Sequence, residues 1–318
     1  MAVGIGSGTG FPDCPYSGAV QIFDITREEP ELLQTLPDAT DWVRSVAFSP
    51  DGNWLATGGV DKKVRIYNGM APVSPPLETL TDAEGLVYSV AYSPDGNWLA
   101  AGSGDTKVRI YNGTAPASPP LHMLPEAISR VRSVAFSPDG DWLAAGEVDK
   151  KVRIYSRTAP VSPPLETLTD AEGLVYSVAF SPDSNWLATG GFDREVRIYS
   201  GTAPASPPLQ TLPEATDRVY SVAFSPDGNW LAAGGGDTDV RIYSGTAPAS
   251  RPLQTLPEAT DCVQSVAFSP DGDWLATGGF DGTVRIYGVS TTGIPDSTST
   301  TPLSAATLLM IMGMAWLW

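Results

Sequence analysis

Short runs of β-branched and aromatic residues alternate with turn sequences along most of this chain. In one unit, the apolar run 43–48 is followed by Ser-Pro-Asp-Gly, and residues 54–58 form a second apolar run. Residues 64–67 alternate with period two, and residues 77–80 follow a proline-rich connection. Pro sets φ and Gly accepts a positive φ, so Pro-Asp-Gly predicts a tight turn. The unit therefore predicts four short strands and no helix.

This unit recurs at a fixed period. The string Ser-Val-Ala-Phe/Tyr-Ser-Pro-Asp begins six times at steps of 44 residues, at Ser45, Ser89, Ser133, Ser177, Ser221 and Ser265. Residues 71–91 recur letter for letter at 159–179. A four-stranded sheet of this size cannot bury both faces alone, whereas radial stacking of such sheets buries them and leaves only short edges. The period therefore predicts an all-β β-propeller of four-stranded antiparallel blades.

The repeat resembles the WD40-repeat family. The resemblance rests on six copies of SVAFSPDGxWLAxGxxDxxVRIY and covers residues 1–288. It implies a propeller that acts as a non-catalytic platform for protein–protein interactions. The alternatives in other functional classes are a propeller enzyme and a propeller that binds a small ligand.

The chain departs from the family pattern in two places. The family's Trp-Asp pair becomes Tyr followed by Asn, Ser or Gly, and its Gly-His pair becomes Asp-Ala or Glu-Ala. The family's Asp-His-Ser-Trp hydrogen-bond network therefore cannot form in its usual way. The family's turn aspartate is retained at Asp61, Asp105, Asp149, Asp193, Asp237 and Asp281, where we expect it to cap local backbone N–H groups. Each third strand carries an arginine that could pair with this aspartate, at Arg65, Arg109, Arg153, Arg197, Arg241 and Arg285.

Residues 1–36 hold a partial copy of the unit. Residues 20–24 match a third strand and 32–36 match a fourth, but the innermost strand is missing, and the last repeat lacks its outer strand. If 32–36 completes the last sheet, the ring has six blades; if the N-terminal piece is its own blade, the ring has seven. We favour seven, because an orphan hairpin is marginal on its own. Truncation of the native N-terminus would explain the missing strand.

Two cysteines lie in loops that open on the same face of the predicted ring. Cys14 belongs to the enlarged loop of the partial blade, and Cys262 precedes the first strand of the last repeat. A disulfide between them would staple the closure. The other interpretation, which we favour, is two free thiols.

The composition changes after residue 288. Residues 289–302 form a Ser/Thr/Pro linker, and the apolar tail 303–318 has no charged side chain. This tail is shorter than the roughly 20 residues that span a bilayer, and the pattern matches a GPI-attachment signal. The candidate attachment region holds Gly293, Asp296 and Ser297. Alternatives are a short hydrophobic anchor, a tail that packs on the ring, and a gene-model artefact. A tether would place the protein at a membrane or the cell surface if the N-terminus is truncated; otherwise we expect it in the cytoplasm.

Charge and composition limit the chemistry. The formal net charge is −17, and an acidic surface repels phosphate backbones, so we expect no nucleic-acid partner. One histidine and two cysteines are too few for a Cys/His zinc site, which needs about four ligands. His122 replaces Glu or Gln of other copies, and we interpret it as a solvated side chain. We therefore expect no catalytic residue, no metal and no cofactor.

Three positions of the repeat vary while the framework stays constant. They precede the first strand, occupy its second residue, and precede the turn aspartate. They lie at or beside loops of one face and include residue types that anchor binding hot spots, so they predict a partner-binding face on a monomer. The alternative is neutral variation at exposed sites. The residues are Trp42, Arg44, Tyr88, Arg130, Arg132, Tyr176, Phe192, Arg218, Tyr220, Gln264 and Phe280.

Overall fold

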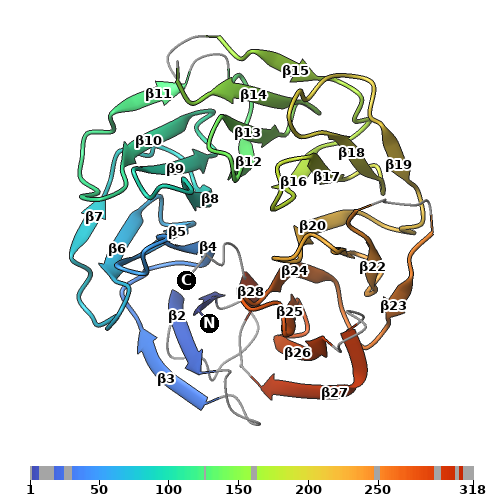
Figure 1. The fold of residues 1–318 in the computed structure, drawn as a ribbon. Helices are drawn as coiled ribbons and strands as arrows, with labels where there is room; N and C mark the ends of the chain where they lie inside the picture. The colour runs from blue at the N-terminus through green and yellow to red at the C-terminus, as the bar shows by residue number, and fades with distance from the viewer. Residues whose placement is uncertain are drawn as a thin grey trace.

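The structure is a computed structural model of residues 1–318. It describes residues 2–6, 18–24, 31–124, 127–158, 163–246, 251–289, 295–304 and 308–310. Within these ranges, seven four-stranded antiparallel sheets are arranged around a central axis (Figure 1). Six of the sheets carry the repeat, and the seventh contains the N-terminal strands. The predicted all-β propeller of four-stranded antiparallel blades is confirmed.

The innermost strands of the six repeat sheets are β4 (Val43–Phe48), β8 (Val87–Tyr92), β12 (Val131–Phe136), β16 (Val175–Phe180), β20 (Val219–Phe224) and β24 (Val263–Phe268). The second strands are β5 (Trp54–Gly59), β9 (Trp98–Ser103), β13 (Trp142–Glu147), β17 (Trp186–Gly191), β21 (Trp230–Gly235) and β25 (Trp274–Gly279). Each second strand pairs with both neighbours in its sheet.

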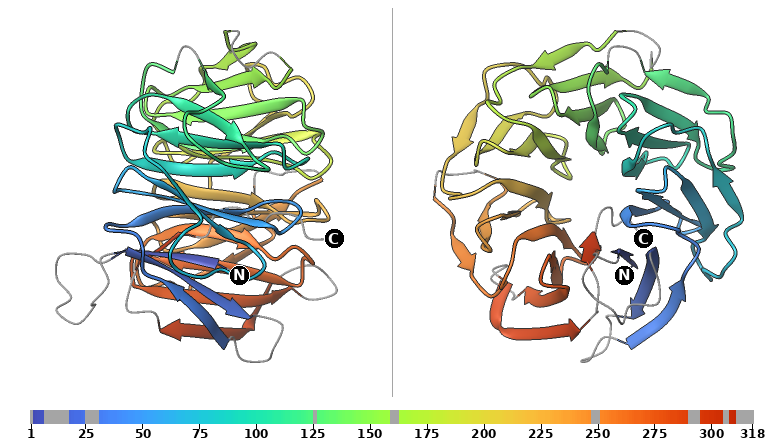
Figure 2. Two further views of the ribbon diagram at one scale, coloured as in Figure 1. Left: turned by 90° about the vertical axis from the view of Figure 1, so that its left-hand side faces the viewer. Right: turned by 180° about the vertical axis from the view of Figure 1, so that it is seen from behind.

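The third strands are β6 (Val64–Asn68), β10 (Val108–Asn112), β14 (Val152–Ser156), β18 (Val196–Ser200), β22 (Val240–Ser244) and β26 (Thr283–Val289). The outer strands are β7 (Glu78–Leu80), β11 (His122–Leu124), β15 (Glu166–Leu168), β19 (Gln210–Leu212), β23 (Gln254–Leu256) and β27 (Pro295–Ser304). The seventh sheet has the order β28 (Leu308–Met310), β1 (Ala2–Gly6), β2 (Gly18–Asp24), β3 (Glu31–Leu36). Seen from the side, the sheets lie across the ring like the blades of a fan (Figure 2).

Segments near both ends of the chain complete the ring. β28 pairs with β1, with Gly4 opposite Met310, and is the innermost strand of the N-terminal sheet. β27 pairs with β26, with Val284 opposite Leu303, and is the outer strand of the last sheet. The prediction that both sheets lack a strand is therefore wrong, because segments without the repeat's sequence supply them. The incomplete repeat is thus no argument for a truncated chain.

The core lies between neighbouring sheets. One cluster joins Ile66 and Leu80 of one repeat sheet to Val87, Leu99 and Tyr111 of the next, and all five side chains are buried. The apolar alternation in each strand provides the two faces that this stacking buries. A glycine allows the close approach, because a Cβ at Gly102 would lie 2.7 Å from Cγ1 of Val131 in the next sheet.

Hydrogen bonds between neighbouring innermost strands add to this packing. The serine that begins five of the six Ser-Val-Ala motifs accepts a hydrogen bond from the N–H of the valine 45 residues later. These donor–acceptor distances are 3.0 Å for Val90 to Ser45 and 3.1 Å for the other four pairs. The pairs are Ser45–Val90, Ser89–Val134, Ser133–Val178, Ser177–Val222 and Ser221–Val266. All these groups are buried, so each bond satisfies an N–H that would otherwise have no partner.

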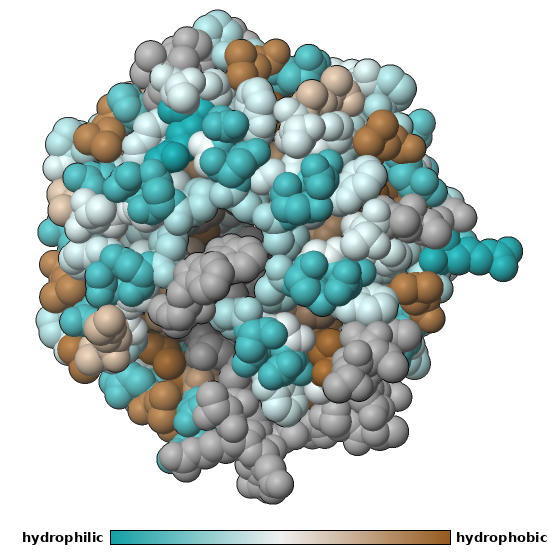
Figure 3. Space-filling view, in the orientation of Figure 1, coloured by the Kyte–Doolittle hydropathy of each residue, from teal (hydrophilic) through white to brown (hydrophobic). Residues whose placement is uncertain are grey.

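A set of leucines remains exposed at the outer strands. The leucine that precedes each of β7, β11, β15, β19 and β23 donates its backbone N–H to the third strand, while 53–62% of its surface is exposed. These residues are Leu77, Leu121, Leu165, Leu209 and Leu253. In the space-filling view, apolar residues gather towards the rim and hydrophilic ones lie closer to the centre (Figure 3).

Candidate functional site

Backbone hydrogen bonds join two of the variable sequence positions. In each repeat, the residue before the turn aspartate donates its N–H to the carbonyl of the residue before the first strand, at 2.8–3.0 Å. Val60 thus binds Trp42, Phe192 binds Leu174 and Phe280 binds Cys262. Each repeat therefore places both positions side by side at one end of its sheet. We call the surface formed by these positions and the second residue of each innermost strand the variable face.

The Ser-Pro-Asp-Gly turns lie at the other end of the sheets. Each innermost strand leads from the variable face to this turn, and the second strand leads back. The turn is held by its own side chains, since Asp51 accepts hydrogen bonds from Ser49 Oγ and Asn53 Nδ2, both at 2.6 Å. Ser184, which replaces the turn glycine in one copy, has the positive φ of 58° that the motif requires.

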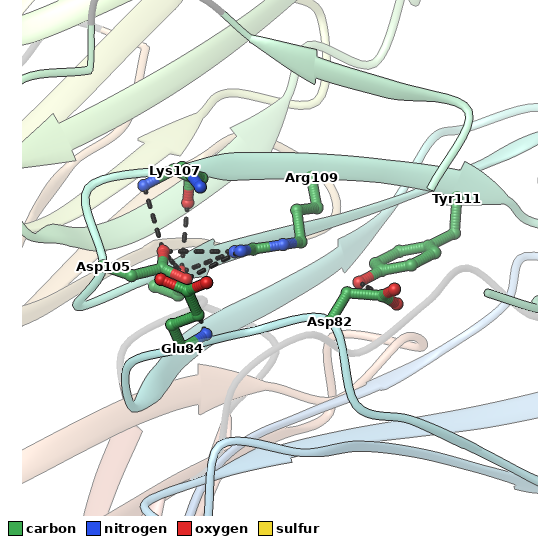
Figure 4. A network of polar contacts seen from close by, with 7 residues as sticks. Asp82, Glu84, Asp105, Lys107, Arg109 and Tyr111 are labelled. Atoms are coloured by element: carbon green, nitrogen blue, oxygen red, sulfur yellow. Dashed lines mark hydrogen bonds and ion pairs between the residues drawn. The ribbon is translucent and has the colours of Figure 1, made fainter. Parts of the chain in front are cut away.

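The turn aspartates form buried ion pairs with the third-strand arginines. All six pairs are present, with distances of 2.6–2.9 Å. In five repeats the aspartate also accepts the N–H of the residue 21 positions earlier, as Asp105 does from Glu84 at 2.8 Å (Figure 4). The aspartate thus ties the loop before the first strand to the turn after the second. Through these contacts, the two loops of the variable face have fixed relative positions.

The pKa values of these aspartates reflect their hydrogen bonds and ion pairs. Burial by itself raises the pKa of the Asp105 carboxyl, but hydrogen bonds from Arg109 and Ser103 outweigh it and lower the pKa to about 2. The pKa of Asp61 is lowered in the same way, with Arg65 as the principal hydrogen-bond donor. These pairs contribute to the scaffold, since both partners are buried and each carboxylate has its counter-charge within the same sheet.

A second network replaces the family's tryptophan. The third-strand tyrosines are almost completely buried, and the Tyr67 hydroxyl donates to Asp38 at 3.1 Å. Tyr111 donates to Asp82 in the same manner (Figure 4). Asp38 also accepts from Ser74 Oγ at 2.6 Å, so the aspartate joins the third strand to the proline-rich connection. Burial, followed by the charge of Asp38, raises the pKa of Tyr67 well above its usual value.

The second residue of each innermost strand lies at a break in strand pairing. In all six repeats the register shifts between the residues on either side of it. Such β-bulges redirect a side chain and are common next to functional sites. The residues at the bulge are Arg44, Tyr88, Arg132, Tyr176, Tyr220 and Gln264.

Several of these side chains contact one another across sheets. The guanidinium of Arg132 lies 4.3 Å from the ring centre of Tyr88 and 5.7 Å from that of Tyr176. The Tyr176 and Tyr220 rings are 5.1 Å apart. Arg44 lies 5.1 Å from the Trp42 ring. These contacts are cation–π and aromatic pairs between buried and partly buried side chains.

The other predicted face residues are placed less closely together. Arg218 stacks on Phe192 at 4.3 Å, and Phe192 and Phe280 are 41% and 42% exposed. Arg130 is exposed, whereas Gln264 is buried. For Arg130, Gln264 and Phe280, the described part of the chain shows no ring contact with the arginine–tyrosine group.

A central cavity of about 300 Å³ follows the innermost strands. The side chains and backbone that line it come from the Ser-Val-Ala-Phe/Tyr-Ser-Pro segments, and none of the lining residues is an acid, a base or a histidine. His122 is in β11, with its ring 5.9 Å from that of Trp98. Among the described residues, no group of three or more His, Cys, Asp or Glu side chains could hold a metal.

The cysteine and tail predictions fall partly outside the described ranges. Cys262 is a free thiol with its Sγ 3.7 Å from the Gly236 carbonyl oxygen, and Cys14 lies outside the described residues. Gly293 also lies outside them, while Asp296 and Ser297 belong to β27. In the ranges described above, no helix is long and apolar enough to cross a membrane.

Two features were not predicted from the sequence. The β-bulge at the second residue of each innermost strand leaves no signal in residue type. Glu147 did leave a signal, because the other repeats carry Gly or Ser at this position. It is fully buried, and its carboxylate lies 2.6 Å from Arg153, which also pairs with Asp149 at 2.9 Å.

Comparison with known families supports the interpretation of the repeat. The WD40 family profile, described as "WD domain, G-beta repeat", matches residues 30–68, 74–112, 119–156, 162–200, 206–244 and 250–288. These matches cover more than half of the chain. A search of curated proteins finds no match.

Proposed function

Because the chain belongs to the WD40-repeat family, whose propellers are typically protein-interaction scaffolds, we propose that its variable face is the surface that binds partner proteins. Propellers of this family are usually non-catalytic and generally bind proteins. The finer assignment to the variable face rests on this chain's own residues.

One observation carries the assignment. Contacts between arginines and aromatic rings run across neighbouring sheets, from Tyr88 through Arg132 and Tyr176 to Tyr220. Aromatic residues and arginine are the usual anchors of protein interfaces, and here they stand at the β-bulges of the innermost strands, beside loops with a rigid support. The scaffold changes little between repeats, so residues that do change at these positions give the face its identity.

The mechanism is rigid display. The turn aspartates and third-strand arginines hold the loops before a partner arrives, as the pair of Asp105 and Arg109 at 2.7 Å illustrates. A partner then loses little loop entropy on binding, and more of the contact energy appears as affinity. The described residues that line the central cavity carry no charge, so the cavity is not the basis of this proposal.

The test is a substitution of face residues by residues that the chain already uses at the same positions. Trp42→Leu, Phe192→Val and Phe280→Val, combined in one variant, correspond to Leu86, Val60 and Val148 of other repeats. The variant should fold like the wild-type protein. Immobilised full-length chain would capture proteins from an extract of the source cells, with identification by mass spectrometry. We expect the variant to lose the partners that the wild type captures.

A matched control changes three exposed asparagines on the opposite face. Asn53→Ala, Asn97→Ala and Asn185→Ala each remove one hydrogen bond to the aspartate of a Ser-Pro-Asp turn, namely Asp51, Asp95 and Asp183. This control should retain the wild-type partners. The assignment would be wrong if the face variant kept the wild-type profile, or if only the asparagine variant lost it.

The C-terminal tail has a role in the ring that competes with a membrane tether. β28 lies within the tail 303–318, and a GPI signal is removed from the mature protein. Removal would take away the innermost strand of the N-terminal sheet. We therefore propose that this segment is retained in the mature protein as part of the ring. Membrane tethering by the tail is the competing prediction. Mass spectrometry of the C-terminus of the mature protein would distinguish them: a chain cleaved near Ser297 and carrying a lipid would exclude our proposal.

A further inference from the structure

We propose that Arg44 and Arg132 form an oxyanion-binding site on the variable face, and that its ligand is the acidic side chain of an extended partner segment. The proposal deepens the proposed function, since it states the chemistry of the partner. A carboxylate and a phosphate share the oxyanion chemistry, and the experiment below separates them.

The first observation is that these two arginines differ from the others in the sheets. Each of the six third-strand arginines pairs with a carboxylate at 2.6–2.9 Å. Within the described ranges, neither Arg44 nor Arg132 forms an ion pair with a carboxylate, and this is what sets them apart from the third-strand arginines. A partly buried guanidinium without a counter-charge has lost part of its hydration, and a bound anion would compensate this loss.

The second observation is that the two charges act on each other. They belong to β4 and β12, and β8 with Tyr88 lies between them in the ring. Burial, and next the charge of Arg132, lower the pKa of Arg44, while Tyr88 and Asp41 oppose this effect. Asp41 already accepts the N–H of Trp42 at 2.7 Å. Two like charges thus face the same innermost strand, β8, from its two sides, in a chain whose net charge is −17.

The third observation is the shape of the site. Both arginines occupy β-bulges, which direct them away from the regular strand pairing. Aromatic rings support the planar faces of the guanidinium groups: Trp42 for Arg44, and Tyr88 with Tyr176 for Arg132. A stacked guanidinium keeps its edge for hydrogen bonding, and its two parallel N–H groups match an oxyanion. The site is thus built for a planar or tetrahedral oxyanion.

The structure also indicates which residues can replace these arginines. Gln264 occupies the same bulge in the last repeat, so Arg44→Gln and Arg132→Gln place a residue that this position accepts. Lys62 and Lys150 are exposed and stand at a positive φ of 67° and 70° in turns of the same face. Changing both lysines to Asn removes the same two charges and suits that backbone conformation.

The experiment measures binding of fluorescent peptides by polarisation at low salt. Four peptides of equal length carry three consecutive glutamates, phosphoserines, glutamines or lysines. The full-length wild type should bind the glutamate or phosphoserine peptide, and the tighter of the two identifies the oxyanion. The variant Arg44→Gln/Arg132→Gln should bind it at least tenfold more weakly, while Lys62→Asn/Lys150→Asn should lose less than threefold. The affinity of Arg132→Lys should be intermediate, because lysine keeps the positive charge but lacks the planar guanidinium that stacks on the tyrosine rings and presents two parallel N–H groups.

Thermal unfolding of each variant, compared with the wild type, checks the fold. The proposal is overturned if neither acidic peptide binds better than the glutamine peptide, or if the lysine variant loses as much affinity as the arginine variant. An arginine variant that loses peptide binding yet captures all wild-type partners would overturn the stated chemistry and leave the variable face intact. If the Trp42/Phe192/Phe280 variant also captured all wild-type partners, the assignment of the variable face would itself be wrong.

Discussion

The buried carboxylate of Glu147 makes the stability of this propeller depend on pH. Its Oε2 is 2.6 Å from Nη1 of Arg153, but neither its oxygens nor that nitrogen has a hydrogen-bond partner of good geometry. Arg153 is shared with Asp149 at 2.9 Å. Burial, with a smaller contribution from the charge of Asp149, raises the pKa of Glu147 to about 7, although Arg153 opposes the rise.

The magnitude follows from this pKa. The ordinary value is 4.5, and each pKa unit corresponds to about 1.36 kcal/mol, so the ionised carboxylate costs the folded state about 3 kcal/mol. Between pH 4.5 and 7 the folded state binds more protons than the unfolded state. Stability therefore falls as pH rises through this window, and the full cost is present above pH 7.

We expect Glu147→Gln to remove this dependence, because the amide has nearly the same shape and does not ionise. The variant should match the wild type near pH 4 and exceed it by about 3 kcal/mol at pH 8. The assay is urea unfolding followed by tryptophan fluorescence at pH 4, 6 and 8. Glu147→Ser, which copies Ser103 of the preceding repeat, should show the same trend.

Glu78→Gln serves as the control, because it removes an exposed carboxylate from β7. Its stability relative to the wild type should change little over the same range. A difference between Glu147→Gln and the wild type that stays constant within about 0.5 kcal/mol from pH 4 to pH 8 would refute the assignment of a raised pKa.

Three further predictions concern the scaffold. Asp105→Asn leaves Arg109 buried without its counter-charge, so the free energy of unfolding at pH 7, measured in urea, should fall by about 3–5 kcal/mol. The difference between wild type and variant should shrink as pH falls from about 4 to 2, because the wild-type carboxylate is then protonated. An unchanged urea midpoint would contradict the buried pair. Ser221→Ala removes the acceptor for the buried Val266 N–H and should cost about 1–3 kcal/mol, measured in the same way, with a loss below about 0.5 kcal/mol as the contrary result. Deletion of residues 305–318 removes β28 and should lower the melting temperature measured by circular dichroism, whereas a tail that only serves as a signal would leave it unchanged.

Much of the fold follows from local sequence. The run Val43–Phe48, the Ser-Pro-Asp-Gly turn and the run beginning at Trp54 predict a hairpin without long-range information, since strand alternation and turn chemistry act over a few residues. The contact between Asp61 and Arg65 could also be predicted from the sequence, because the two residues lie in one short turn and the strand that follows it.

The candidate site was only partly predictable. The comparison of repeats identified Arg44 and Arg132 as variable, but their lack of carboxylate partners depends on which side chains neighbouring sheets bring near them. The β-bulge that directs these arginines depends on pairing between strands, which residue type does not reveal. In the sequence, Glu147 is only an exception among glycines and serines. Its burial, which only the structure shows, is what raises its pKa.

By itself, the sequence of this chain determined a ring of four-stranded sheets, because a unit repeated six times must pack in the same way each time. It also determined which positions vary on that ring. Only the tertiary structure decided how the ring closes. Pairing of β28 with β1 is made by backbone groups, and such pairing needs no particular side chains. The structure alone likewise decided which arginines pair with a carboxylate, because charge compensation depends on distance in space.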